Sequence, residues 1–240
     1  MTQIPSSRLS LKAGVSLHEV RGNAIGDYID ALAQLRIAVF REYPYLYDGD
    51  MTYERAYLAP MERSPDALVM LVRDETDIVG FVSATPLNET HQELREPFTR
   101  SAIDPARVFY LAEFVLLPFY RGRGLGKQLM AQSLNFADTL NRENRSPQTG
   151  PHQRFDFIAL CAVDRSGELS SSRYRPPADY HSPDPLWRSA GFRRAGEEGI
   201  PSLTASFSWR EVGHHEESLH PMIFWLKPLV AHATIASPPL

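Results

Sequence analysis

The chain has 240 residues, of which 43% are hydrophobic and 22% are charged, a composition typical of a globular protein with a sizeable core. Its formal net charge of -4 and pI of about 6.1 argue against a large interface with a phosphate backbone, so we expect no nucleic-acid partner. The only cysteine, Cys161, excludes an intrachain disulfide, and no apolar run suits a signal sequence or a membrane span, so we expect a cytoplasmic protein with no membrane partner.

Apolar periodicity and turn residues divide the first half of the chain into three helices, a hairpin and a central strand. The first helix has apolar residues at the spacing of a buried face, and it ends before an aromatic loop at 43–49. The expected elements are helices over 28–41, 52–61 and 88–96, hairpin strands over 67–73 and 78–84, and the central strand over 108–117.

The second half contains two expected helices and four expected strands, separated by long polar or proline-containing loops. Loops as long as the one at 173–185 are often functional in a compact domain. Asp184 is a plausible N-cap for the shorter helix. The expected elements are helices over 124–141 and 185–190, strands over 155–163, 192–194, 204–212 and 221–226, a polar loop over 144–153, and a loosely ordered tail over 228–240.

The most informative stretch, LLPFYRGRGLGK at 116–127, joins the central strand to the helix over 124–141. Glycine in such a turn can adopt positive φ and lets a ligand approach the main chain. The first turn of the following helix offers free N–H groups and the positive end of a dipole. The stretch therefore predicts a phosphate site built from backbone.

The spacing in this turn excludes the commonest phosphate loops. A P-loop requires glycine where Arg121 stands and Ser or Thr where Gln128 stands. A dinucleotide fingerprint requires G-x-G-x-x-G, whereas the three glycines here alternate with other residues. The remaining pattern is Arg-x-x-Gly-x-Gly, formed by Arg121, Gly124 and Gly126.

This pattern, after a strand that ends in proline and before a helix, resembles the acetyl-coenzyme A signature of the GCN5-related N-acetyltransferase (GNAT) family. A second stretch, DPLWRSAGF at 184–192, is similar to the short helix and Gly-Phe that precede the last hairpin in that family. The resemblance covers about 28–227 and implies one GNAT-like domain over 1–240. The implied fold is α/β (an α+β mixed sheet), a central mixed β-sheet flanked by helices, in the order β, α, α, β, β, β, α, β, α, β, β.

The resemblance also implies a function and a cofactor site. We expect an N-acetyltransferase that moves an acetyl group directly from acetyl-CoA, its co-substrate, to a primary amine, without a metal, as a monomer or homodimer. Long loops that can close the acceptor site favour a small molecule. The alternatives are a non-catalytic acetyl-CoA sensor and a structural protein whose turn binds nothing. The implied cofactor-binding residues are Phe114, Val115, Leu116, Arg121, Gly122, Arg123, Gly124, Leu125, Gly126, Lys127 and Trp187.

Glu113 is the candidate catalytic residue, because it interrupts the apolar run of the central strand just before the expected acetyl position. A buried carboxylate is costly unless it is paired or functional, and a raised pKa there would suit a general base. Two alternatives remain open. Glu113 can be a structural carboxylate bonded to a neighbouring strand or to an arginine such as Arg36, or it can bind the ammonium group of the substrate.

The residue that would protonate the departing thiolate differs from the usual one of the family. Trp187 occupies the position of the tyrosine that the family often uses, and an indole cannot serve as the acid. Tyr180 or water can replace it, and Trp187 is expected to pack against the pantetheine arm or the core.

The other reactive side chains are expected to pack in the core, to lie at the surface or to line the acceptor site. Cys161 is expected to be an inert core residue. The histidines lack metal partners at ligand spacing and are expected in exposed loops: His181, His214, His215 and His220. Arginines and tyrosines at 36–47 are expected to form an acceptor wall that suits an anionic or ring-bearing acceptor, or to pack the loop.

Overall fold

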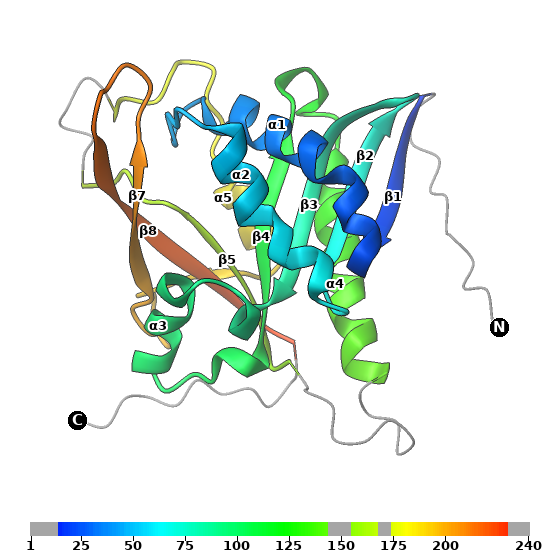
Figure 1. Cartoon of the computed structure of the whole chain (residues 1–240). Coiled ribbons are helices and arrows are strands. Elements are labelled where there is room, and N and C mark those ends of the chain that lie inside the picture. Colours follow the sequence, from blue (N-terminus) through cyan, green and yellow to red (C-terminus); the bar gives the residue numbers. More distant parts are fainter. Residues whose placement is uncertain (1–13, 144–154, 168–173, 230–240) are drawn as a thin grey trace.

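The computed structural model describes residues 14–143, 155–167 and 174–229 (Figure 1). The polar loop expected over 144–153 and positions 230–240 of the expected tail lie outside the described residues. One mixed sheet of eight strands has the order β1-β2-β3-β4-β5-β8-β6, with β7 also paired to β8. Neighbouring strands are antiparallel except β4 and β5. The strands are β1 Val15–Arg21, β2 Leu68–Asp74, β3 Asp77–Pro86, β4 Val108–Leu116, β5 Phe157–Val163, β6 Arg193–Arg194, β7 Thr204–Arg210 and β8 Glu217–Pro228.

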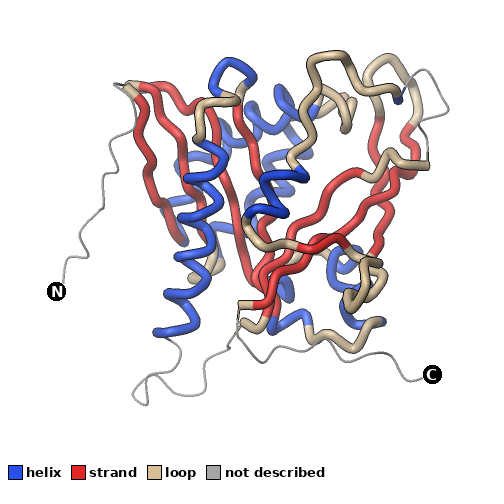
Figure 2. The backbone as a smooth tube through the Cα atoms, turned by 180° about the vertical axis from the view of Figure 1, so that it is seen from behind, coloured by secondary structure: helices blue, strands red, loops and turns tan. Residues whose placement is uncertain are grey.

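Helices cover both faces of the sheet. In Figure 1, α1 and α2 lie in front of the sheet and α3 lies below them, whereas Figure 2, seen from behind, shows α4 and α5 on the other face. The expected fold class, a mixed α/β sheet flanked by helices, is therefore confirmed. The helices are α1 Ile29–Phe40, α2 Met51–Leu58, α3 Gln92–Arg100, α4 Leu125–Glu143 and α5 Asp184–Ser189.

Strand β2 shows how the sequence pattern produces this layering. Side chains alternate between the two faces of a strand, so a strand covered on both faces is apolar throughout. Residues 68–72 are all buried: Leu68, Met70 and Val72 join the core under α4, whereas Val69 and Leu71 join the core under α1 and α2. The sheet thus separates the core under α4 from the core under α1 and α2.

The expected elements are found within a few residues, with three differences. The sheet begins with β1, before the stretch 28–227 to which the resemblance was assigned; its seven residues alternate only weakly and are mostly half-buried. Strand β8 begins at Glu217 instead of 221; the sequence missed its first residues because 217–219 are exposed and have one isolated apolar side chain, Leu219. Asp184 lies inside α5 instead of capping it; Pro183 is the N-cap, and the Ser182 hydroxyl accepts the Asp184 N–H at 3.2 Å.

Candidate active site

The sheet opens between β4 and β5. These parallel strands pair only over four positions, 108–111, and then diverge (Figure 1). Strand β4 continues to pair with β3 on its other edge, with Ala112 as the extra residue of a bulge between Leu111 and Glu113. Bulges commonly redirect a strand next to a functional site. Residues 112–116 therefore face the opening without a β5 partner, and an extended ligand can hydrogen-bond there much as an added strand does.

The glycine turn lies directly after β4. A 3-10 turn, Pro118–Tyr120, is followed by Gly122 at φ +71° and Gly124 at φ +83°, and α4 begins at Leu125. A Cβ at Gly122 or Gly124 would meet nothing within 4 Å, so the space beside this backbone is open. The first N–H groups of a 19-residue helix therefore point toward a free approach, which is the geometry of an anion site.

The third glycine has a packing role as well. Gly126 lies in the first turn of α4, and a Cβ there would approach Leu186 Cδ2 at 3.3 Å and Phe114 Cε1 at 3.7 Å. The missing side chain thus lets α5 and β4 pack closely against the start of α4. Leu125 is buried in the same core, whereas Lys127 is exposed.

The two arginines of the turn have partners. Arg121 Nε donates to the Leu116 carbonyl at 2.9 Å, and its Nη1 lies 2.7 Å from Glu42 Oε2. The Arg123 guanidinium lies 4.2 Å from the centre of the Phe119 ring. Arg121 therefore ties the turn to the end of β4, and both cations remain at the open side.

Glu113 lies at the opening and is 2% exposed. Arg36 Nη1 and the Ser83 hydroxyl donate to its two carboxylate oxygens. Arg36 Nε also donates to the buried carboxylate of Glu54, so one guanidinium joins two buried acids. Burial raises the pKa of Glu113 to about 7, opposed by Arg36 and assisted by the charge of Glu54.

The contact between Glu113 and Arg36 is the one that the structural alternative expects. It does not use up the carboxylate, since an ionised carboxylate has about four acceptor positions. The Arg36 guanidinium opposes the effect of burial on the pKa of Glu113 and so favours the ionised carboxylate, the form that a general base requires.

A cavity of about 180 Å³ reaches Glu113 from the face covered by α2 and α3. Helices α2 and α3, which contribute to its lining, lie on the face of the sheet opposite α4, the helix that the glycine turn begins (Figure 1 and Figure 2). Its lining residues are Tyr57, Pro60, Met61, Thr85, Glu89, Thr90, His91, Leu94, Tyr110, Ala112 and Glu113.

Sequence reasoning missed two tyrosines of this cavity. Burial and the neighbouring Glu113 raise the pKa of Tyr57, and burial with Cys161, Tyr57 and Glu113 raises that of Tyr110 well above its ordinary value, so both hydroxyls stay protonated. Tyr110 gave no signal, because it lies in an apolar strand. Tyr57 stands three residues after Glu54 on α2, and that spacing of an acid and a phenol on one helical face was a usable signal.

The other predicted site residues are placed as follows. Trp187 is 7% exposed and packs edge-on against Trp225, with ring centres 5.2 Å apart, so it contributes to the core. Tyr180 is half-buried and packs edge-on against Tyr43 at 4.7 Å, and burial raises its pKa. The structure thus places Tyr180 against the aromatic loop. Phe114 and Leu116 pack on the core under α4, and Val115 on the core under α1.

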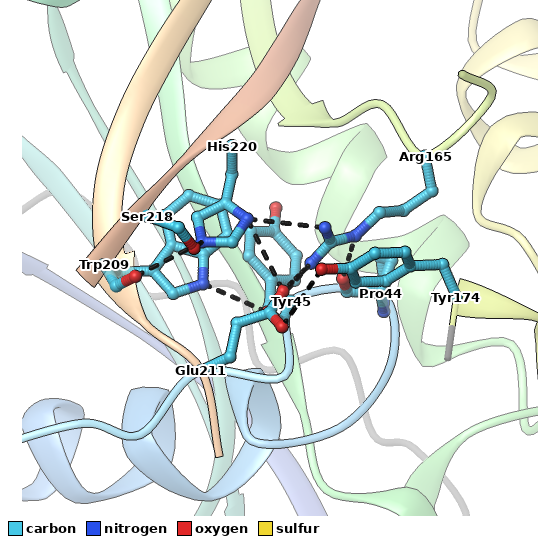
Figure 3. A network of polar contacts seen from close by, with 8 residues as sticks. All are labelled: Pro44, Tyr45, Arg165, Tyr174, Trp209, Glu211, Ser218 and His220. Carbon is cyan, nitrogen blue, oxygen red and sulfur yellow. Dashed lines mark hydrogen bonds and ion pairs between the residues drawn. The ribbon is translucent and has the colours of Figure 1, made fainter. Parts of the chain in front are cut away.

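A buried polar network fixes the aromatic loop to β7 and β8 (Figure 3). Arg165 Nε donates to the Pro44 carbonyl at 2.9 Å, and Nη2 donates to the Tyr45 carbonyl at 3.3 Å and to Glu211 Oε1 at 2.8 Å. The Trp209 indole N–H donates to the same Tyr45 carbonyl at 3.1 Å. The side chains of Arg165 and Glu211 are only 3% and 1% exposed. The loop is therefore held by its backbone.

The expectation for His220 is wrong. It is 1% exposed and stacks on Trp209 with ring centres 3.8 Å apart, because the early start of β8 places it inside the sheet. His181, His214 and His215 are exposed as expected. Cys161 is partly buried, and burial raises the pKa of its thiol, which keeps it protonated.

The described stretches of the chain contain no group of three or more His, Cys, Asp or Glu side chains arranged to hold a metal. None of their helices has the length and apolar character needed to cross a bilayer.

Comparison with known proteins gives a family match and two similar solved structures. Residues 31–146 match the model of the acetyltransferase (GNAT) family. The putative acetyltransferase yncA from Salmonella typhimurium, solved with its cofactor acetyl-CoA, is 14% identical, with a TM-score of 0.50 over 93% of this chain and 99% of that chain. An N-acetyltransferase from Staphylococcus aureus Mu50 is 10% identical, with a TM-score of 0.53 over 91% and 100%. A comparison with curated protein sequences gives no match.

Proposed function

We propose that this chain, whose residues 31–146 belong to the GNAT family of acetyltransferases, transfers an acetyl group from acetyl-CoA directly to the primary amine of a small molecule. The divergence of β4 from β5 carries the proposal, because it opens the sheet between the glycine turn and the cavity at Glu113. A thioester approaching from one face and an amine from the other can then meet at the opening. Alignment of this kind supplies much of the rate enhancement of a two-substrate reaction.

The cofactor half of the site uses mainly backbone. The pyrophosphate of acetyl-CoA would be bound by N–H groups of 122–127, and the pantetheine arm would extend along 114–116. A main-chain N–H at the opening would polarise the acetyl carbonyl, as in an oxyanion hole. The similar fold of yncA, which was solved with acetyl-CoA, supports this assignment.

The acceptor half of the site centres on Glu113. The neutral amine attacks the thioester carbonyl, the N–C bond forms, the C–S bond breaks, and the amine proton passes to Glu113 directly or through water. The departing thiolate takes a proton from Tyr180 or from water. Tyr180 suits the first route only if the aromatic loop brings it to the thiolate.

A free-thiol release assay with acetyl-CoA and a panel of primary amines tests this function. We expect thiol release that depends on both substrates and an acetylated amine as the product. The competing hypothesis, a sensor without catalysis, expects acetyl-CoA to raise the melting temperature while no amine accelerates thiol release. Absence of both effects would contradict each hypothesis.

Gly124→Ala should weaken acetyl-CoA binding by about ten- to a hundredfold. The Cβ fills the open side of the turn and displaces backbone from φ +83°, so at least one charge-assisted hydrogen bond of about 1.5–3 kcal/mol is lost. Calorimetry on the folded protein measures the affinity.

Gly196→Ala is the matched control. Gly196 has φ +85°, and a Cβ there would also meet nothing within 4 Å, but it lies outside the turn. It should carry the same backbone strain and leave the affinity unchanged. Equal affinities of both variants for acetyl-CoA would remove the turn from the cofactor site.

The pH dependence of kcat/KM should show an acidic limb with a midpoint near pH 7. Glu113 must be deprotonated to accept the amine proton, and its folded-state pKa is raised from 4.5 to about 7, so activity is present above pH 7 and lost as pH falls through it. The profile is measured with a correction for the fraction of neutral amine. A midpoint near 4.5 would mean that the active base is an ordinary exposed carboxylate.

A further inference from the structure

The cavity at Glu113 is lined by aromatic, apolar and acidic side chains. Its aromatic side chains are Tyr57, Tyr110 and His91, and the Tyr57 and His91 rings are stacked at 5.3 Å with an angle of 18°. The carboxylates in its lining are Glu89 and Glu113, and no lysine or arginine belongs to the lining. Flat apolar walls with acidic groups suit a cation attached to a ring and disfavour an anion.

The nearby arginines do not supply a site for an anion. Arg36 lies behind the wall, 4.4 Å from the centre of the Tyr57 ring, and donates to both Glu54 and Glu113. Arg41 pairs with Asp48 at 3.2 Å. Two carboxylates thus face the one guanidinium of Arg36, which leaves this cation no free side for an anionic acceptor. The anionic acceptor that the sequence left open is therefore disfavoured at this cavity.

The volume limits the size of the acceptor. A protein cavity of roughly 150 Å³ holds one benzene molecule. The present cavity, at about 180 Å³, accommodates one ring with a short chain. The amine at the end of that chain can then reach the bulge at Ala112 and Glu113, where the sheet opens.

On the basis of the proposed function, we infer that the acceptor is an arylalkylamine: a primary amine joined by a short chain to one aromatic ring, with no anionic group. The ring lies against Tyr110 and the stacked pair of Tyr57 and His91, and the amine lies against Glu113. Glu89 at the cavity favours cationic molecules and repels carboxylates.

The test compares 2-phenylethylamine with phenylalanine, which adds only a carboxylate, and with spermidine, which lacks the ring. We expect kcat/KM for 2-phenylethylamine to exceed that for phenylalanine by about 100-fold, since a like charge in a desolvated site costs several kcal/mol. It should also exceed that for spermidine, which has no ring to pack against the aromatic walls. Comparable kcat/KM for phenylalanine, or a preference for spermidine, would overturn the inference.

A charge reversal with a matched control locates the preference at this cavity. Glu89→Lys should reduce the ratio of 2-phenylethylamine to phenylalanine at least about tenfold by adding a cation to the lining. Glu93→Lys makes the same change at an exposed position of α3 that does not line the cavity, and the ratio should stay as in the parent protein. Equal ratios in the two variants would place the acceptor elsewhere.

Removal of the Tyr57 ring on α2 tests the aromatic wall. Tyr57→Leu should raise KM for 2-phenylethylamine about two- to tenfold, the contribution of an aromatic pair, at unchanged affinity for acetyl-CoA. Because the Tyr57 hydroxyl also hydrogen-bonds Glu113, the effect is judged on KM and on amine binding, and not on kcat. The control is Tyr53→Leu on the same helix. Tyr53 is 58% exposed and does not line the cavity, so this variant should leave KM for 2-phenylethylamine unchanged. Melting curves of both variants confirm that they are folded.

Binding distinguishes this inference from the proposed function. Calorimetry with the coenzyme A complex compares 2-phenylethylamine and phenylalanine without turnover. Absence of transfer to any amine contradicts the proposed function, whereas equal affinity for the two amines contradicts the inference.

Discussion

Glu113→Gln should lower kcat/KM by about 10²- to 10⁴-fold and leave the affinity for acetyl-CoA unchanged. Glutamine keeps the volume of the side chain and can still contact Arg36 and Ser83, but it cannot accept the amine proton. The acidic limb of the pH profile should disappear with it. Steady-state kinetics and calorimetry on the same folded preparation measure the two effects.

The control is Ser83→Ala, which removes one hydrogen bond to Glu113 and keeps its carboxylate. It should retain the acidic limb and most of the activity. The two alternative roles give different results for Glu113→Gln. A structural carboxylate predicts a lower melting temperature with nearly normal activity of the folded fraction, and an anchor for the substrate ammonium predicts a higher KM for the amine at constant kcat.

Arg165→Met should lower the free energy of unfolding by about 3–5 kcal/mol. The guanidinium contacts the buried Glu211 and two carbonyls of the aromatic loop, and removal of one partner of a buried ion pair leaves a charge without its compensation. Denaturant unfolding monitored by two probes measures the change.

Arg210→Met provides the comparison at the same junction. Arg210 pairs with Asp48 of the loop at 3.0 Å, but the two side chains are 46% and 33% exposed. An exposed ion pair contributes about 0–1 kcal/mol, so the loss should be correspondingly small. Equal losses in the two variants would show that burial does not determine the contribution of the Arg165 network.

Features with a local cause were predictable from the sequence. The glycine turn is such a case, because the spacing of Gly122 and Gly124 already requires a backbone that only glycine adopts easily. The partners of Glu113 were among the alternatives that the sequence left open, because an acid in an apolar strand needs a partner: Arg36 and Ser83 of the neighbouring strand both donate to it.

Features that depend on distant segments were not predictable. The cavity joins Tyr57 of α2, His91 at the start of α3 and Tyr110 of β4, and no local pattern relates these positions. His220 was misjudged because residues 214–218 are polar and the single apolar residue before it, Leu219, is exposed, so the true start of β8 had no alternating apolar pattern. Strand β1 was assigned no residues for the same reason: its side chains are mostly half-buried and alternate weakly.

The short pairing of β4 with β5 also affects the stability of the sheet. Within the sheet, strands β1 to β4 are joined to β5 and the strands beyond it by only four residue pairs, at 108–111. A pantetheine arm bound in the gap would contact β4 beyond residue 111, where β4 no longer pairs with β5, and would so connect the two halves of the sheet. Bound acetyl-CoA would then contribute to the stability of the fold. At a free concentration a hundred times its Kd, this contribution would be about 2.7 kcal/mol. Release of the product would remove this support, so on the proposed function we expect the fold to be least stable between turnovers, before the next thioester enters.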